Sequence, residues 1–351
     1  MSELRCSTLA REVGLDPLGT AGHYAGFLLV QWPLPWPEDL SQAEGLEPVV
    51  EALAGTTIRL QGLVPAEPPG NDRRVVLYRR PPGAGFRRYQ RSEHHVPHEQ
   101  LVEAAVDLVR GSPLMGGADV PPDGNERPLT ASDTSPEGSR HPAASEDTSA
   151  GGGEHAANAR YASSGGGDFL ICTHGRRDAC CGGKGTALFG ELSSADALAD
   201  GGYRLSRTSH TGGHRFAPTG IVLPEGTMWA FLDRDLVDRI ARRHGPLDEV
   251  LAHYRGCSGL GSPELQAVER AAFAEIGWDW LDWHRWGEQD SDGRVRLVGE
   301  APDGRRVAWT AAVGVRERPV PVCGEPLSAA VKNQREPVVT SLERTPVPAT
   351  R

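Results

Sequence analysis

The chain reads CTHGRRDACCGG at residues 172–183, directly after the apolar run Phe169-Leu170-Ile171. The run has the length and composition of a buried strand, and the glycines after Cys181 are typical of a turn into a helix. A second segment, SHTGGHRF at residues 209–216, follows one helical and one strand-like pattern. Together they hold three of the six cysteines and three of the twelve histidines. Thiolates and imidazoles, which bind transition metals well, are therefore concentrated where two strands of a predicted βαβ unit end.

The composition is that of a globular protein with an acidic surface. Of the 351 residues, 38% are hydrophobic and 24% are charged, and the net charge is -10. This charge argues against nucleic acid or an anionic membrane as the main partner. The 43 glycines and 28 prolines require at least one long segment that does not pack. No feature of the sequence sets the oligomeric state.

The N-terminal segment and the apolar runs bear on the compartment. Residues 1–13 are polar and charged and lack the apolar core of a signal peptide. The longest aliphatic run, residues 26–32, is too short to cross a bilayer. We therefore expect a cytoplasmic protein that does not contact the membrane. Thiols stay reduced in the cytoplasm, so clustered cysteines indicate metal ligands or catalytic groups there.

The periodicity predicts a first unit over residues 1–110 and a long insertion after it. The unit has strands and helices in the order βαββα, at residues 26–32, 38–54, 57–64, 74–80 and 99–110. Residues 111–167 are rich in Gly, Pro and Ser and contain almost no large apolar side chains. Such a composition cannot bury enough surface to offset the entropy of ordering, so we expect a disordered insertion.

A second unit, residues 168–276, repeats this order. Strands are predicted at residues 168–173, 203–207, 220–223 and 228–232, and helices at 185–198, 234–243, 247–254 and 263–276. A βαβ unit followed by a β-hairpin and a helix is the order of the thioredoxin fold. We therefore expect an α/β protein of tandem thioredoxin-like units. Residues 277–333, with their cluster of tryptophans, predict a small C-terminal β appendage, and residues 334–351 a flexible tail.

The residue types and their spacing point to a metal centre. Cys172 lies at the carboxyl end of a predicted central strand, and Cys181 precedes a glycine-rich helix start, which lowers the pKa of a thiol. Gly212 and Gly213 favour a tight loop that brings His210 and His214 together. Two cysteines and two histidines satisfy one zinc ion or a [2Fe-2S] cluster. The wide C-x8-C spacing lacks the tight knuckle of short zinc sites and favours the larger cluster.

The segments CTHGRRDACCG and SHTGGHRFAPT resemble the two signatures of the sucrase/ferredoxin-like family, and the resemblance extends from Cys6 to about Ile276. These relatives are thioredoxin-like [2Fe-2S] ferredoxins with bis-histidine ligation. The resemblance implies four ligands in this chain, namely Cys172, Cys181, His210 and His214. Cys180 is an alternative to Cys181, because either adjacent thiol could reach the metal.

The resemblance also implies electron transfer to or from a redox partner protein, either a reductase or an electron acceptor. No motif supports sucrose hydrolysis, so a non-catalytic electron carrier is favoured over an enzyme. Two neutral imidazoles in place of two thiolates raise the reduction potential, and their second nitrogens could couple electron transfer to proton transfer. The side chains that flank the ligands and could tune the cluster are His174, Arg176, Arg177, Asp178, Cys180 and Arg215.

Two other readings of the same residues stay open. The four ligands could hold zinc in a zinc-stabilised binding protein. Alternatively, Cys180 or Cys181 could act in a thiol-dependent oxidoreductase, although a C-x-x-C motif is absent. We expect Cys6, Cys257 and Cys323 to be isolated and buried, and His94, His95 and His98 to lie on a solvated loop.

Overall fold

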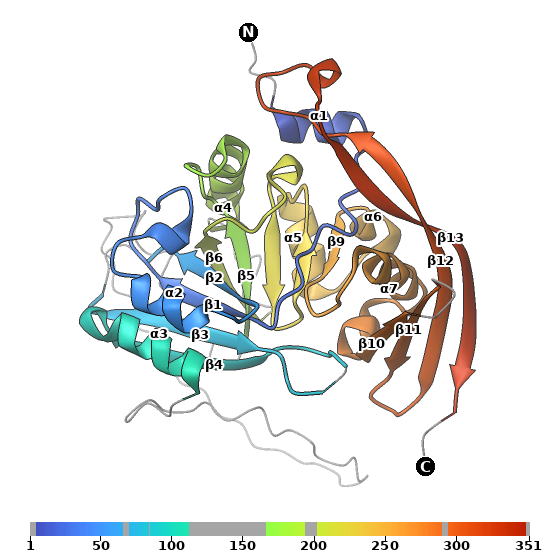
Figure 1. Ribbon diagram of the computed structural model, residues 1–351, viewed down its shortest axis with the longest axis horizontal. Helices are drawn as coiled ribbons and strands as arrows, with labels where there is room; N and C mark the ends of the chain where they lie inside the picture. Colours follow the sequence, from blue (N-terminus) through green and yellow to red (C-terminus); the bar gives the residue numbers. More distant parts are fainter. Residues whose placement is uncertain are drawn as a thin grey trace, which may run out of the picture.

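The computed structural model describes residues 5–65, 70–83, 85–111, 166–193, 202–289 and 294–348. Nine strands form one mixed sheet (Figure 1). In chain order they are β1 (Gly26–Gln31), β2 (Ile58–Leu63), β3 (Asp72–Arg79), β4 (Gln90–Pro97), β5 (Gly167–Cys172), β6 (Tyr203–Thr208), β7 (Gly220–Leu223), β8 (Thr227–Trp229) and β9 (Tyr254–Cys257). Their spatial order is β4-β3-β1-β2-β6-β5-β7-β8-β9. The expected α/β class is therefore confirmed.

The first half of the large sheet is built around β1, whose apolar residues are buried because packed layers cover both of its faces. β1 pairs in parallel with β2 and antiparallel with β3, and β3 pairs with β4. Helix α2 (Glu47–Leu53) connects β1 to β2, and α3 (Leu101–Arg110) packs against β1 and β3. The residues of α3 that face the sheet recur every three or four positions, as the sequence predicts. They include Leu101, Ala104, Ala105 and Leu108.

The second half repeats the strand order of the first. β5 pairs in parallel with β6 and antiparallel with β7, and β7 pairs with β8. β9 then extends this half by one strand. The halves join where β2 and β6 meet edge to edge, with Leu63 opposite Thr208. This junction brings strands from both halves next to the end of β6, where the histidine segment begins.

Helices of the second half begin at capping residues that the sequence supplies. A π-helical turn, η3 (Cys181–Gly185), leads into α4 (Thr186–Ser193). Asp233 accepts the amide of Leu236 at the start of α5 (Arg234–Arg242), and Ser262 caps α7 (Pro263–Ile276) in the same way. The two remaining helices are α1 (Cys6–Glu12) and α6 (Leu247–Leu251).

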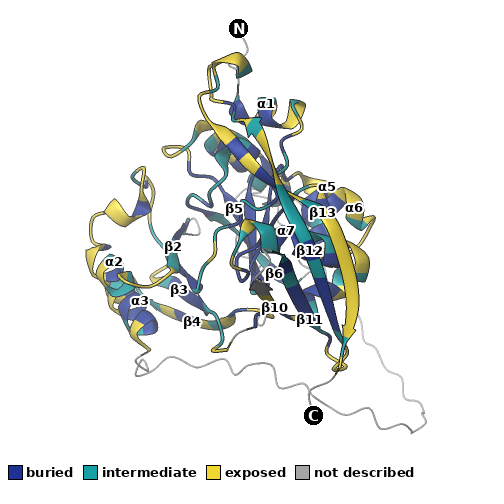
Figure 2. Ribbon diagram, turned by 45° about the vertical axis from the view of Figure 1, so that its right-hand side comes forward, coloured by how far each residue is buried: buried dark blue, intermediate teal, exposed yellow. Residues whose placement is uncertain are grey.

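A separate four-stranded sheet forms the expected C-terminal appendage. Its strands are β10 (His284–Gln289), β11 (Val295–Glu300), β12 (Arg306–Pro319) and β13 (Asn333–Val347). Helix α7 contacts β9 of the large sheet and β11, β12 and β13 of the small one, so it lies between the two sheets (Figure 1). Much of β13 is exposed (Figure 2).

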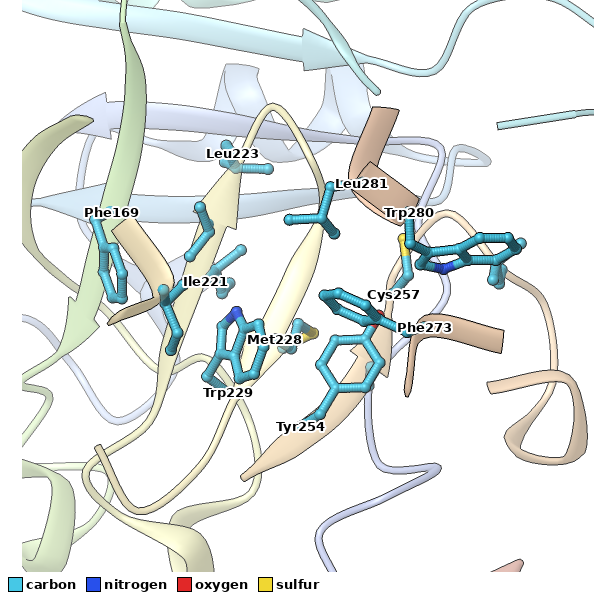
Figure 3. Close-up of a cluster of buried hydrophobic side chains, with 14 of the residues drawn as sticks. Phe169, Ile221, Leu223, Met228, Trp229, Tyr254, Cys257, Phe273, Trp280 and Leu281 are labelled. Carbon is cyan, nitrogen blue, oxygen red and sulfur yellow. The ribbon is translucent and has the colours of Figure 1, made fainter. Parts of the chain in front are cut away.

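Aromatic side chains fill the space around α7. Figure 3 shows Trp229, Tyr254, Phe273 and Trp280 in one buried cluster that also contains Cys257. The rings of Trp280 and Trp309 lie 5.3 Å apart, edge to face. Tryptophans of the appendage thus form part of the core that holds the two sheets together.

A buried ion pair lies within this aromatic layer. Glu269 of α7 accepts hydrogen bonds from Arg285 Nη1 and the Tyr254 hydroxyl, both at 2.9 Å. The side chains of Glu269 and Arg285 are fully buried, and Arg285 also donates to the Arg87 carbonyl. The pair therefore links α7, the appendage and the first half of the chain.

The structure corrects several expectations. The prediction of a flexible tail from residue 334 is wrong, because residues 333–347 form β13, which pairs with β12 along its length. The buried side chains of β13 include Gln334 and Glu336, so no apolar alternation marks the strand in the sequence. His94 and His95 lie in β4 and not on a loop. Of the predicted insertion, residues 111–167, positions 112–165 lie outside the described residues.

Candidate metal centre

The cysteine segment begins at Cys172, the last residue of β5. It ends at Cys181, where η3 starts and packs back against this strand. Asp178 shapes this loop, because its Oδ1 accepts the amide hydrogens of Cys180 and Cys181 at 2.8 and 3.2 Å. The sulfur atoms of Cys172 and Cys181 and a ring nitrogen of His210 all lie within 4.8 Å of one another. Both thiols are fully buried. These three side chains could hold a metal ion.

The glycines after Cys181 serve close packing. A Cβ atom at Gly185 would collide with the carbonyl oxygen of Cys172, and one at Gly182 would collide with Gly175. The π-helical turn can therefore pass directly behind the end of β5 only with glycine at these positions.

The histidine segment forms the tight loop that the sequence predicts. Gly212 and Gly213 adopt φ angles of 80° and 69°, in the left-handed region. The loop ends in a short 3-10 turn, η4 (His214–Phe216). A Cβ atom at Gly213 would lie 2.8 Å from Nη2 of Arg255, so a larger residue would also displace that side chain.

Arg255 is a buried cation behind this loop that sequence analysis did not identify. Its Nη1 donates to the Gly212 carbonyl at 3.1 Å, and its Nε and Nη2 donate to the Thr20 hydroxyl and carbonyl. Burial lowers the pKa of Arg255 to about 10, so the guanidinium remains charged at neutral pH. An arginine inside the otherwise uncharged strand β9 is the signal that could have revealed it.

The first half of the chain also positions the site, which the sequence did not indicate. Arg59 Nη2 and Gln61 Nε2, both on β2, donate to the carbonyl of His210 at 2.5 and 3.2 Å. Residues 59 and 61 share one side of the strand because side chains alternate. Gly62 and Ser209 exchange hydrogen bonds beside them. Strand β2 therefore fixes the backbone of the histidine loop.

The two thiols of the three-residue group have pKa values shifted in opposite directions. The Cys181 thiol, assisted by His210 and by the amides of His174 and Thr211, holds the pKa of Cys172 well below its usual value, although burial opposes the shift. The same contact and burial raise the pKa of Cys181. His210 Nδ1 is buried and has no hydrogen-bond partner among the described residues. A thiolate beside a half-buried imidazole whose Nδ1 has no partner among the described residues fits a transition-metal ion.

His214, the fourth expected ligand, lies at the edge of this group. Its Nδ1 is 3.5 Å from Asp178 Oδ2, and it forms a group within 4.8 Å with Asp178 and Cys6. Burial lowers the pKa of His214, and the carboxylate opposes that shift. Three of the four expected ligands are thus brought together, and the fourth contacts Asp178, whose other carboxylate oxygen accepts the amide of Cys181.

The adjacent thiols Cys180 and Cys181 belong to different groups. Cys180 Sγ lies 3.6 Å from Cys6 Sγ and 3.5 Å from Cys323 Sγ. The expectation that Cys6 and Cys323 are isolated is therefore wrong, and Cys323 is exposed. Cys257 is buried in the aromatic core, as expected.

The remaining flanking residues make contacts that hold the loops in place. His174 Nε2 donates to the Pro37 carbonyl at 2.8 Å, and its ring packs edge-on against Trp36. Burial lowers the pKa of His174. Arg215 Nε donates to Gln334 Oε1 at 3.0 Å. Arg176 and Arg177 are exposed, and Arg177 lies 3.8 Å from a carboxylate oxygen of Glu38.

Comparison with known proteins gives one match. The profile of the sucrase/ferredoxin-like family matches residues 17–256, which is more than half of the chain and includes both loops of the centre. No curated protein and no solved structure matches the chain. Within the described residues, no helix is both long and apolar enough to cross a lipid bilayer. On the strength of this match, the chain belongs to the sucrase/ferredoxin-like family.

Proposed function

We propose that this protein is an electron carrier that holds a [2Fe-2S] cluster on Cys172, Cys181, His210 and His214. The observation that carries the proposal is the group of two buried cysteines, Cys172 and Cys181, and the half-buried His210, in which the pKa of Cys172 is lowered and His210 Nδ1 has no partner among the described residues. Membership of the sucrase/ferredoxin-like family supports the same assignment.

The position of His214 bears on the choice between a cluster and a single zinc ion. Ligand atoms on one tetrahedral zinc lie about 3.4 to 3.8 Å from one another, because zinc binds nitrogen and sulfur at about 2.0 to 2.3 Å. His214 does not share the 4.8 Å group of the other three ligands. Each iron of a [2Fe-2S] cluster takes two protein ligands, so His214 must also move toward His210 to complete a cluster, and family membership is what favours the cluster.

A [2Fe-2S] cluster, when bound, takes up and releases single electrons. Neutral His210 and His214 bring less negative charge to it than two further thiolates would, which raises the reduction potential. Asp178 faces His214 Nδ1, which leaves Nε2 of that imidazole for the metal. A proton held at Nδ1 beside this carboxylate provides a means of coupling electron transfer to proton transfer.

We extend the proposal to the fold, the compartment and the partner. Each half of the large sheet is a thioredoxin-like unit, as the repeated strand order supports. The second unit carries the ligands, and the first fixes His210 through Arg59 and Gln61. The partner is a reductase or an electron acceptor protein in the cytoplasm.

The test is the visible absorption spectrum of anaerobically purified protein, with iron and sulfide analysis. His210→Cys and His214→Cys should each shift the charge-transfer bands and lower the reduction potential. The exposed His244, which contacts Asp238 far from the loops in sequence, provides a matched control, and His244→Cys should leave the spectrum unchanged. A colourless protein with zinc and no sulfide would refute the proposal. A metal-free protein inactivated by alkylation of Cys180 or Cys181 would instead indicate a thiol-dependent oxidoreductase.

A further inference from the structure

Three cysteines that the proposed cluster does not use converge at a second place. The sulfur atoms of Cys6, Cys180 and Cys323 all lie within 4.8 Å of one another. Cys180 is the middle member, 3.6 Å from Cys6 and 3.5 Å from Cys323. The amide of Cys6 also points at the sulfur of Cys323, 3.3 Å away.

The three residues come from distant parts of the chain. Cys6 is the first residue of α1, Cys180 precedes η3, and Cys323 lies between β12 and β13. Cys6 and Cys180 are separated by 174 positions, and Cys180 and Cys323 by 143. Figures 1 and 2 both show the connection between β12 and β13 beside α1. These thiols are therefore brought together by the tertiary fold and not by closeness in the sequence.

The spacing of the sulfur atoms matches metal ligation better than a disulfide. A disulfide bond is about 2.05 Å long, much shorter than either distance. Thiolates on one tetrahedral zinc lie about 3.8 Å apart, because each Zn–S bond is about 2.3 Å. The separations of 3.6 and 3.5 Å are close to this value. As thiols, these side chains hydrogen-bond to one another at such distances. Once deprotonated they repel one another unless a cation lies between them, and zinc is a common ion for a donor set of thiolates.

We propose that Cys6, Cys180 and Cys323 form a second metal site, which binds one zinc ion through three thiolates. Exposure of Cys323 leaves the fourth position of the ion to a water molecule. The site does not depend on which cofactor occupies the first centre, because its ligands are different residues. Its metal ties α1 and the β12–β13 connection to the loop that carries Cys181.

Other contacts bring the same elements together and support this arrangement. Lys184 Nζ donates to the Thr8 hydroxyl at 3.0 Å, which joins η3 to α1. Arg318 of β12 donates to the carbonyl of Val13, just after α1. Arg215, next to His214, donates to Gln334 of β13. Several hydrogen bonds therefore hold together the elements that carry the three thiols.

The test is the zinc and iron content of the full-length protein, purified under reducing, anaerobic conditions. Cys323→Ser alters an exposed residue and should leave the fold intact. We expect this variant and Cys6→Ser to lose one zinc per chain, with at least a tenfold drop in zinc content, while iron, sulfide and the visible spectrum stay as in the wild type. Cys172→Ser should lose iron and sulfide and keep the zinc. Cys257→Ala removes a thiol outside both groups and should keep both metals.

These variants separate the failure of each proposal. The second site is refuted if Cys323→Ser keeps its zinc, if the wild type holds none, or if mass spectrometry finds a disulfide between two of the three cysteines in the reduced preparation. Loss of iron from Cys323→Ser would also refute it, because the thiol would then serve the first centre. Zinc that disappears only in Cys172→Ser would count against the iron–sulfur assignment and against the second site together. As an independent readout, Co²⁺ added to the Cys172→Ser protein after a chelator has removed its zinc should give thiolate charge-transfer bands that are absent after a further Cys323→Ser change.

Discussion

Nδ1 of His214 lies 3.5 Å from Oδ2 of Asp178, and Oδ1 of the same carboxylate accepts the amides of Cys180 and Cys181. One side chain thus connects the cysteine loop to the histidine loop. The side chain of Asp178 is 12% exposed and that of His214 is 43% exposed, so water partly screens this connection. The geometry leads to a direct comparison of two substitutions.

Asp178→Asn should keep the amide acceptor and lose only the negative charge beside His214. We expect the variant to retain its metal and show a higher reduction potential. Asp178→Ala removes the acceptor as well, and should weaken metal retention by about 10- to 100-fold, the usual effect of losing a residue that orients a ligand. Metal content and potentiometry measure the two effects, and equal behaviour of both variants would contradict this role.

The adjacent thiols should respond differently to the same substitution. Cys181→Ser removes a member of the Cys172–Cys181–His210 group and should abolish the visible spectrum. Cys180→Ser should retain the spectrum and the iron, since Cys180 contacts Cys6 and Cys323 instead. The reverse pattern, with iron lost only in Cys180→Ser, would show that the wrong thiol has been assigned to the first centre.

Arg59→Met should loosen the histidine loop from the first half of the chain. The change removes a charged donor to the His210 carbonyl, a contact of about 1.5 to 3 kcal/mol, and the contact of Arg59 with the Tyr24 ring, while Gln61 still donates. We expect faster loss of metal to a chelator, measured by absorbance decay. Arg73→Met provides the control, because the hydrogen bonds that Arg73 makes among the described residues go only to nearby carbonyls of its own segment. Equal decay rates for the two variants would argue against a role for β2 in the site.

Acid should destabilise the protein partly through His253. Burial lowers the pKa of His253 below its ordinary value of 6.5, so the folded state binds its proton less readily than the unfolded state. This contribution to stability is present above about pH 6.5 and declines as the pH falls, by at most about 1.4 kcal/mol per pH unit. His253→Gln should therefore flatten the pH dependence of the free energy of unfolding. An unchanged slope in His253→Gln would refute the assignment.

Glu336 should matter for stability far more than other acidic residues of β13. Its side chain is almost fully buried and accepts from Arg316 Nη2 at 2.7 Å and from the Asp16 amide at 2.9 Å. Glu336→Leu leaves that amide without its acceptor and should cost about 2 kcal/mol. Glu343→Leu, at an exposed position of the same strand, should change stability by less than about 0.5 kcal/mol. Chemical denaturation of both variants checks the difference.

The sequence was sufficient where one periodicity dominated. The aliphatic run of β1 is buried on both faces, α3 turns its apolar face to one core, and the strand before Cys172 is buried throughout its apolar run, so their patterns survive in the fold. The tight loop between His210 and His214 was predictable for a different reason, because only glycine adopts its backbone angles at low cost.

Other features depend on partners that are distant in the sequence. β13 buries the polar side chains of Gln334 and Glu336, which form hydrogen bonds with residues 16 and 215. The sequence of this strand therefore looks like that of a solvated tail. Arg59 and Gln61 reach His210 only because β2 and β6 meet edge to edge, and nothing in either strand specifies that junction. Cys6 and Cys323 looked isolated because a sequence shows only how far apart residues lie along the chain, and not which of them meet in space.

The amide of Cys6 lies 3.3 Å from the sulfur of Cys323, although 317 positions separate the two residues. During synthesis, both loops of the candidate metal centre leave the ribosome well before residue 323 does. Contacts across so long a stretch of chain form slowly and late in folding. The loops therefore spend part of the protein's maturation without the β12–β13 connection beside them, and closure of that connection over α1 is a natural final step of assembly.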